Sequence, residues 1–271
     1  MNPFNLKNRR RIHLQADSPN IIVAGVSDVG CLRTINEDHI WIHDSGKVLL
    51  LADGMGGHDR GADASRIALE TLSVSIPPEI NNDQIEDIKN PEGISPEIAS
   101  VYSVIHRAVK KAAGVMVERN SELKLSKYMG TTVVGAFFTD SNYICWFHIG
   151  DSRVYRLRKG KLDCLTVDHS LYAEWEKAGS PGEAPAKHLI TRVLGNKPEV
   201  EADIDWDKSN KGDIYLLCSD GLHDMISDTE IKKILKSRKK IPDIANMLVS
   251  EALSAGGKDN VSVILCKILK D

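Results

Sequence analysis

Long apolar runs, paired cysteines and a strong net charge are all missing from this chain of 271 residues. No apolar run approaches the length of a membrane-spanning helix, and the N-terminus carries no apolar leader. We therefore expect neither membrane insertion nor a signal peptide. The five cysteines are odd in number and include no CxxC pair, which argues against a disulfide framework and a structural zinc site. We expect free thiols in a reducing compartment and a cytoplasmic location.

The charge balance points away from nucleic acid as a partner. The formal net charge is −3, and the one basic cluster, residues 7–11, lies in a polar, aperiodic stretch. We predict that residues 1–20 are a flexible tail. Residues 21–271 contain no internal repeat and no low-complexity linker. Because the whole chain has 42% hydrophobic and 27% charged residues, we predict one compact domain there.

The order of apolar and turn-forming segments predicts antiparallel sheets covered by helices. Predicted strands cover residues 21–27, 39–42, 48–52, 133–138, 143–149, 153–157, 213–218 and 261–269. Predicted helices cover residues 61–75, 98–116, 227–235 and 242–255. The three strands between residues 133 and 157 are predicted as an antiparallel meander, and residues 166–200 as a functional flap. Because strands come in consecutive groups, a parallel, doubly wound sheet is disfavoured.

Acidic residues recur where a predicted strand meets a turn. The apolar run Val48–Ala52 ends on Asp53, and the glycines that follow let backbone carbonyls approach a ligand closely. Turns favour Asp in any case, so each of these residues alone could be structural. A cluster of such carboxylates at one sheet edge would need cations to neutralise it, and oxygen ligands favour Mg²⁺ or Mn²⁺. The acids in question are Glu37, Asp38, Asp53, Asp151, Asp220 and Asp259.

Seven segments occur in an order that closely resembles the metal-dependent protein phosphatase family (PPM, type 2C), in particular its compact bacterial members. They are Ser27-Asp28-Val29-Gly30 with Arg33 and Asn36-Glu37-Asp38, Asp53-Gly54-Met55-Gly56-Gly57-His58, Met129-Gly130-Thr131-Thr132, Gly150-Asp151-Ser152-Arg153, Leu165-Thr166-Val167-Asp168-His169-Ser170, Ser219-Asp220-Gly221 and Lys258-Asp259-Asn260. The resemblance covers roughly residues 22–268. It implies an α+β fold, a four-layer α-β-β-α sandwich with two central antiparallel sheets.

The resemblance also implies the roles of individual residues. Asp53 would bridge two Mg²⁺ or Mn²⁺ ions, with Glu37 and the Gly54 carbonyl completing one of them. Asp220 and Asp259 would bind the second ion, and Asp151 with Asp220 would bind a third ion whose occupancy varies. Asp38 and Asn260 would lie close by and hold metal-bound water. Of the two catalytic residues, Arg33 would clamp the phosphate and His58 would be the general acid.

These roles imply a phosphatase that removes phosphate from phosphoserine and phosphothreonine in proteins, without a phosphoenzyme. A Ser/Thr kinase would be its counterpart in signal transduction, and we expect a monomer. The alternative is a catalytically silent regulator of the same fold that binds a phosphoprotein. From the residues alone, Arg33 could be an ordinary surface arginine and His58 could cap its loop. We interpret Thr166 and His169 as structural residues outside the site.

Overall fold

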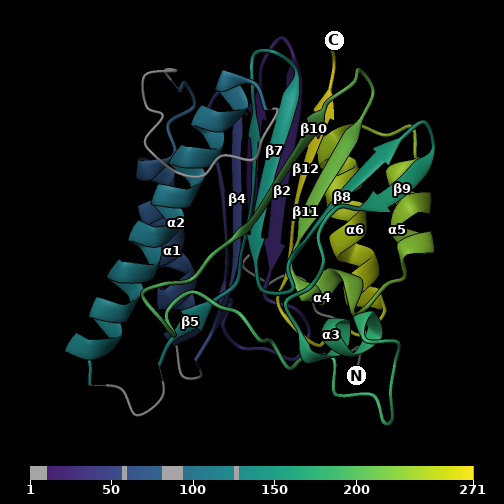
Figure 1. Ribbon diagram of the computed structural model, residues 1–271. Helices are drawn as coiled ribbons and strands as arrows, with labels where there is room; N and C mark the ends of the chain where they lie inside the picture. Colours follow the sequence, from purple (N-terminus) through teal and green to yellow (C-terminus); the bar gives the residue numbers. More distant parts are fainter. Residues whose placement is uncertain (1–10, 57–59, 81–93, 125–127, 271) are drawn as a thin grey trace.

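Two antiparallel sheets stack face to face in the computed structural model, which describes residues 11–56, 60–80, 94–124 and 128–270 (Figure 1). The first sheet has the order β1 (Ile12–Asp17), β2 (Ile21–Asp28), β12 (Val261–Ile268), β11 (Ile214–Cys218), β8 (Arg153–Arg158) and β9 (Lys161–Cys164). The second has the order β10 (Asp203–Lys208), β7 (Tyr143–Ile149), β6 (Val133–Phe138), β4 (Val48–Met55) and β3 (Asp38–Ile42). A short strand, β5 (Gly130–Thr131), pairs with the end of β4.

Helices cover the outer face of each sheet and give the four layers that the sequence resemblance implied. Helices α1 (Arg60–Ser75) and α2 (Pro96–Glu122) pack on the second sheet. Helices α4 (Asp220–His223), α5 (Asp228–Leu235) and α6 (Ile241–Ser254) pack on the first. Helix α3 (Leu171–Lys177) lies in the flap, at the lower end of the sandwich in Figure 1. No helix in the described ranges has both the length and the apolar character needed to cross a membrane.

Strand β4 shows why the central strands are apolar without alternation. Leu49 and Leu51 face the core between the two sheets, whereas Leu50 and Ala52 face the core beneath α1 and α2. All four side chains are completely buried. A strand covered on both faces needs apolar residues at every position, so its sequence reads as a continuous run.

The helix ends follow the signals in the sequence. Ser227 and Glu230 form the predicted capping box at the start of α5, with reciprocal hydrogen bonds between side chain and backbone. Pro242 lies in the first turn of α6, where its missing N–H is not needed. Gly256 and Gly257 follow the end of α6 with φ values of +131° and +51°. Such positive values suit glycine and stop the helix there.

Two of the predictions are corrected by the structure. Residues 1–20 were predicted as a tail, but Ile12–Asp17 forms β1, which pairs along its length with β2. The strand β1 is short, and the alternation of apolar and polar residues in it is too weak to predict a strand from the sequence. The predicted meander is also wrong in its last strand, because the chain crosses between β7 and β8 from one sheet to the other. Residues 1–10 lie outside the described part.

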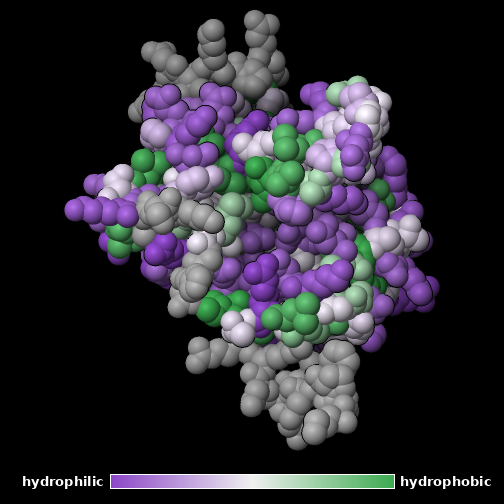
Figure 2. Space-filling model, turned by 90° about the horizontal axis from the view of Figure 1, so that it is seen from below, coloured by the Kyte–Doolittle hydropathy of each residue, from purple (hydrophilic) through white to green (hydrophobic). Residues whose placement is uncertain are grey.

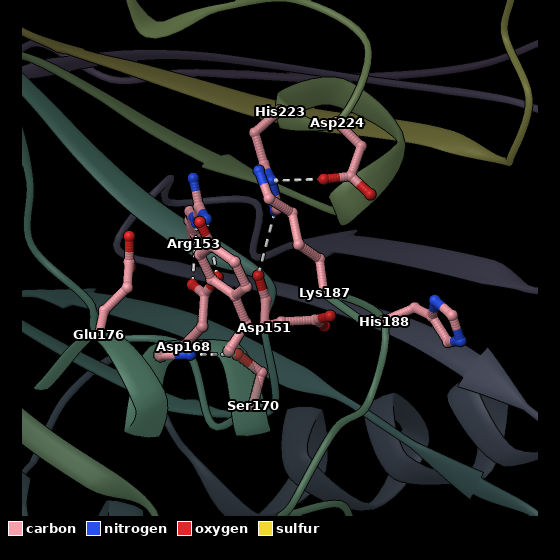
Figure 3. Close-up of a pocket in the computed structure, with 11 residues that line it drawn as sticks. Asp151, Arg153, Asp168, Ser170, Glu176, Lys187, His188, His223 and Asp224 are labelled. Carbon is pink, nitrogen blue, oxygen red and sulfur yellow. Dashed lines mark hydrogen bonds and ion pairs between the residues drawn. The ribbon is translucent and has the colours of Figure 1, made fainter. Parts of the chain in front are cut away.

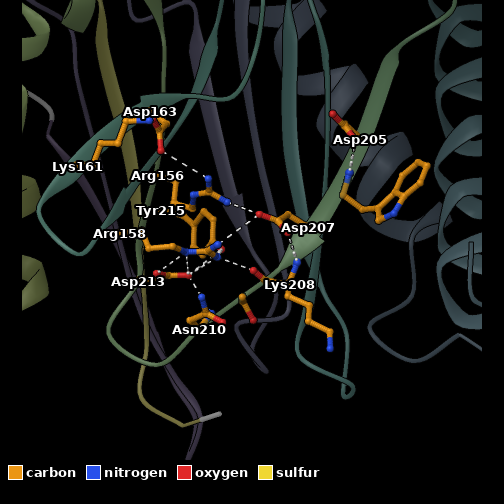
Figure 4. A network of polar contacts seen from close by, with 12 residues as sticks. Arg156, Arg158, Lys161, Asp163, Asp205, Asp207, Lys208, Asn210, Asp213 and Tyr215 are labelled. Carbon is orange, nitrogen blue, oxygen red and sulfur yellow. Dashed lines mark hydrogen bonds and ion pairs between the residues drawn. The ribbon is translucent and has the colours of Figure 1, made fainter.

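A polar network joins β8 of the first sheet to the edge strand β10 of the second (Figure 4). Arg156 on β8 reaches across to Asp207 on β10. Arg158 on the same strand donates to the buried carboxylate of Asp213 at 2.7 Å, and the Tyr215 hydroxyl donates to that carboxylate at 3.2 Å. The strand β10 was not predicted from its sequence, in which acidic residues alternate. Only the structure shows that Arg156 and Arg158 lie beside the acidic residue Asp207 of this strand.

Candidate active site

Four carboxylates meet where the two sheets end together, and two of them, Asp38 and Asp151, belong to buried residues. Strand pairing sets Asp38, the first residue of β3, directly opposite Asp53 on β4. From the other sheet, β11 leads into Asp220, and the Ser219 N–H donates to the Ser262 carbonyl of β12 at 3.1 Å. The Ser219 hydroxyl in turn donates to Asp38 Oδ2 at 2.9 Å, across the junction between the sheets. Asp151, in the crossing from β7 to β8, completes the group.

Burial, together with the negative charges of neighbouring carboxylates, raises the pKa values of these acids. Burial, followed by the negative charges of Asp38, Asp220, Asp151 and Asp259, raises the pKa of Asp53 well above its ordinary value. Burial also raises the pKa of Asp38 to about 7, although the Ser262 and Ser219 side chains oppose this by hydrogen bonding. Burial and the charge of Asp220 raise the pKa of Asp151 to about 7. Such a cluster is unfavourable as a set of bare anions.

Unpaired oxygen atoms in this cluster fit divalent cations. Among the described residues, Oδ1 of Asp38, of Asp151 and of Asp220 is buried without a hydrogen-bond partner. A buried carboxylate oxygen without a donor is costly, and a hard cation supplies the missing partner. The donor set consists of oxygen atoms only, which favours Mg²⁺ or Mn²⁺ over zinc. The residues present therefore fit the ions that the sequence predicts.

Two glycines are required by close backbone approaches beside the carboxylates. A Cβ at Gly54 would lie 1.9 Å from the carbonyl oxygen of Gly61 and 2.8 Å from that of Glu37. A Cβ at Gly221 would lie 1.9 Å from the carbonyl oxygen of Asn260. No side chain fits at either position. These contacts bring α1 against the end of β4 and α4 against the start of β12.

Asn260 organises the segment that carries Glu37. Its side-chain amide donates to the Val29 and Ile35 carbonyls, both at 2.9 Å, and its Oδ1 accepts from the Glu37 N–H at 2.8 Å. The Glu37 carboxylate accepts from the N–H of Gly61, near the start of α1, at 3.0 Å. The role predicted for Asn260 was to hold water near the ions. The structure shows in addition that it fixes the backbone of the crossing between β2 and β3.

Arg33 lies at the rim of the cluster, on the same crossing. Its guanidinium donates to Asp259 Oδ2 at 2.7 Å, and its side chain is 51% exposed. The hydrogen bond to Asp259 raises the pKa of Arg33, which therefore stays charged. Arg33 is a planar cation with further N–H donors, and it lies at the mouth of a carboxylate cluster that divalent cations would neutralise. This position suits the binding of a phosphoryl group.

A polar pocket of about 250 Å³ opens beside Asp151 (Figure 3). Its walls come from β8, from α3 and the flap, and from α4. His223 of α4 donates through Nε2 to the Asp151 carbonyl at 3.1 Å. Lys187 of the flap reaches into the pocket, with its ammonium 5.1 Å from the centre of the Tyr172 ring, whereas His188 points away. Figure 2, which views this end of the molecule, shows hydrophilic residues across the middle of the face.

The structure brings together most of the predicted site. Asp38, Asp151, Asp220 and Asp259 lie near enough to Asp53 for their charges to raise its pKa. Arg33 joins this cluster through its hydrogen bond to Asp259, and Asn260 holds Glu37 beside it. His58 lies outside the described residues, so its role stays a prediction. Sequence reasoning missed His223 and Ser219. Their signal was their position, because His223 follows Asp220 by one turn of α4 and Ser219 precedes it directly.

Comparison with known proteins identifies the family. A profile described as "Protein phosphatase 2C" matches residues 34–256. The chain is 32% identical over 247 residues to the serine/threonine phosphatase stp of Listeria monocytogenes, covering 88% of this chain and 92% of that protein. It is 35% identical over 249 residues to the protein phosphatase PhpP of Streptococcus pneumoniae, covering 89% and 94%. The chain belongs to the protein phosphatase 2C family.

Solved structures of this family share the fold. The catalytic domain of the serine/threonine phosphatase PstP, crystallised with two manganese ions, matches with a TM-score of 0.77 at 32% identity, covering 93% of this chain and 99% of that one. The serine/threonine phosphatase of S. agalactiae matches with a TM-score of 0.78 at 28% identity, covering 92% and 99%. The predicted sandwich of two antiparallel sheets and flanking helices is thereby confirmed for this protein phosphatase 2C chain.

Proposed function

We propose that this protein phosphatase 2C chain is a protein serine/threonine phosphatase that uses two Mn²⁺ or Mg²⁺ ions and a third, weaker one. The observation that carries the proposal is a cluster of carboxylates around Asp53 in which Asp38, Asp151 and Asp220 each have a buried oxygen without a hydrogen-bond partner. Family membership and the manganese-containing PstP structure support the choice of ion. When bound, such ions lower the pKa of a water molecule and neutralise the charge of a phosphoryl group.

The chain's own residues would contribute by holding and orienting. Asp53, Glu37 and the Gly54 carbonyl would hold one ion, and Asp53 with Asp220 and Asp259 the other. The Arg33 guanidinium, held in place by Asp259, would orient the phosphoryl oxygens through its remaining N–H donors. His58, five residues after Asp53, would protonate the departing serine or threonine oxygen.

The test is hydrolysis of a phosphothreonine peptide by the purified protein, with Mn²⁺ and with EDTA. We expect phosphate release with Mn²⁺, none with EDTA, and a loss of 100-fold or more in kcat for Asp220→Asn, on the order of magnitude found when a catalytic electrostatic group is removed. Asp140→Asn, in the turn between β6 and β7 with a side chain that is 78% exposed, is the matched control and should retain activity. Activity that survives EDTA would refute the metal-dependent mechanism. Peptide binding without hydrolysis would instead indicate a silent regulator.

The cellular setting follows as part of the same proposal. We propose a cytoplasmic monomer whose substrates are phosphorylated by a Ser/Thr kinase, so that the pair forms a reversible signalling step. The absence of paired cysteines supports the compartment. We further propose that the phosphatase domain predicted over residues 21–271 extends to include β1, because β1 completes the first sheet.

A further inference from the structure

Two stacked imidazoles and a carboxylate lie together outside the carboxylate centre. The rings of His148 and His169 are parallel to within 18°, with centroids 4.4 Å apart. Asp203 Oδ2 lies 3.3 Å from His169 Nε2, and one potential ligand atom from each of the three residues falls within 4.8 Å of the others. Both histidines are buried. These three residues could form a second cation site, or they could support the carboxylate centre by holding its neighbouring segments in place.

The hydrogen bonds of the two rings argue against a cation site. The Gly150 N–H donates to His169 Nδ1 at 3.0 Å, so the proton of the neutral His169 ring is on Nε2, the atom that faces Asp203. His148 uses its own Nε2–H on the Val167 carbonyl at 2.8 Å. A cation at His169 Nε2 would therefore need an imidazolate ring. The guanidinium of Arg192 already pairs with Asp203.

Instead, His169 holds Gly150 by both of its backbone polar groups. The His169 N–H donates to the Gly150 carbonyl at 2.9 Å, while His169 Nδ1 accepts from the Gly150 N–H. Gly150 has a φ of +103°, and a Cβ there would lie 2.6 Å from the Thr132 methyl group, so the turn is confined on its other side as well. The next residue is Asp151, which is 5% exposed and has a buried Oδ1 without a hydrogen-bond partner.

His169 is also the point where the two ends of the flap meet. The Thr191 N–H donates to the His169 carbonyl at 2.8 Å. The next residue, Ser170, caps α3 and pairs with Ile190 in an isolated bridge. On the ring side, Arg192 lies near the end of the flap, and Asp203 is the first residue of β10, the strand that follows the flap. His169 therefore contacts the beginning of the flap, its end and the Gly150 turn.

We propose that His169 is a positioning residue that fixes the Gly150–Asp151 turn and couples the placement of the Asp151 carboxylate to the conformation of the flap. A flap that shifts on substrate binding moves Thr191 and Ser170, and His169 passes that movement to Asp151. This inference goes beyond our interpretation of His169 as a structural residue outside the site. It rests on the proposed function only in that Asp151 is taken as a cation ligand.

Two substitutions at His169 separate positioning from packing. His169→Phe keeps a ring for the stack on His148 but puts a carbon where Nδ1 accepts from Gly150. His169→Asn loses the ring but keeps an acceptor, because Asn Oδ1 and His Nδ1 are both bonded to Cγ. The matched control is His148→Phe, which retains the stack and loses only the hydrogen bond to Val167.

The first readout is Mn²⁺ binding by isothermal titration calorimetry, without substrate. We expect His169→Phe to weaken the weakest Mn²⁺ site by about 10- to 100-fold, the range typical for residues that support metal ligands. His169→Asn and His148→Phe should stay within about three-fold of the unmodified protein, since neither removes the acceptor for Gly150. In an Asp151→Asn background, His169→Phe should have no further effect on Mn²⁺ affinity.

The second readout is hydrogen exchange of the Gly150 amide in the metal-free protein, which tests the clamp without any ion. Faster exchange in His169→Phe, and near-normal exchange in His169→Asn, supports the proposal. Equal Mn²⁺ affinities for His169→Phe and His148→Phe, with only their melting temperatures lowered, would overturn it. If His169→Phe does not fold, His169→Gln replaces it, because its carbonyl cannot reach the Nδ1 position. Failure of the unmodified protein to bind Mn²⁺ would refute the proposed function instead.

Discussion

The carboxylate Asp151 should make the metal-free protein less stable at neutral pH than an uncharged replacement does. Its pKa is about 7 in the folded chain against an ordinary value of 3.8, because of burial and the nearby charge of Asp220. The folded state therefore holds a proton on Asp151 over a pH range in which the unfolded state has lost it. Where the folded state binds more protons than the unfolded state, raising the pH lowers the free energy of unfolding. The protein must therefore lose stability as the pH rises from about 4 to about 7.

The size of this effect follows from the two pKa values. A difference between 3.8 and about 7 corresponds to about 4 kcal/mol of unfolding free energy lost between pH 4 and pH 7.5. For a chain of this size, 1 kcal/mol moves the melting temperature by about 2–4 °C. Asp151→Asn removes the titrating group and keeps the shape of the side chain. We therefore expect the EDTA-treated variant to melt roughly 8–16 °C above the unmodified protein at pH 7.5.

The assay is differential scanning fluorimetry of both metal-free proteins from pH 4 to pH 8. At pH 4 the two melting temperatures should nearly coincide, because Asp151 is then protonated in the folded state. Groups that titrate elsewhere in the chain affect both proteins equally and cancel in the difference. Saturating Mn²⁺ should reverse the order at pH 7.5, since only the unmodified protein gains the ligand. A melting-temperature difference that does not change with pH would refute the reasoning.

Three further substitutions test other parts of the site. Gly221→Ala forces a Cβ against the Asn260 carbonyl, and urea unfolding should show a loss of at least about 2 kcal/mol. Asn260→Ala removes three hydrogen bonds to Val29, Ile35 and Glu37, and we expect a loss of about 3 kcal/mol together with a higher Mn²⁺ requirement in the phosphatase assay. His58→Ala should lower kcat far more on a phosphoserine peptide than on an aryl phosphate, whose leaving group needs less protonation. Equal losses on the two substrates would argue against His58 as the general acid.

The elements that could be predicted from sequence are those whose signals are local. The buried strand Val48–Met55, the capping box of α5 and the glycine stop after α6 all depend on neighbouring residues. The β1 strand and the sheet change between β7 and β8 depend on partners far away in the chain, so periodicity alone could not show them. Most of the site could be predicted because several acidic residues at strand ends and turns together indicate one cation-binding cluster, although each of them alone could be structural.

The supporting residues were harder to predict, for a similar reason. Ser219 matters because its hydroxyl reaches Asp38 across the two sheets, and no spacing in the chain encodes that contact. His169 supports the site because its backbone N–H and its ring Nδ1 both form hydrogen bonds with the backbone of Gly150. Serine and histidine at strand ends are common, and only the structure shows which of them touch the turn that carries a functional acid.

The chain crosses between the two sheets three times at the end that holds the carboxylates: between β2 and β3, between β7 and β8, and between β9 and β10. Those crossings carry Arg33 and Glu37, then Asp151, then the whole flap. The catalytic centre therefore lies at the junction between the two sheets and depends on residues from both of them. It can assemble only after both sheets have formed and docked, which makes ion binding a late event in folding. Enzymatic activity should therefore report on correct docking of the sheets more strictly than secondary structure does.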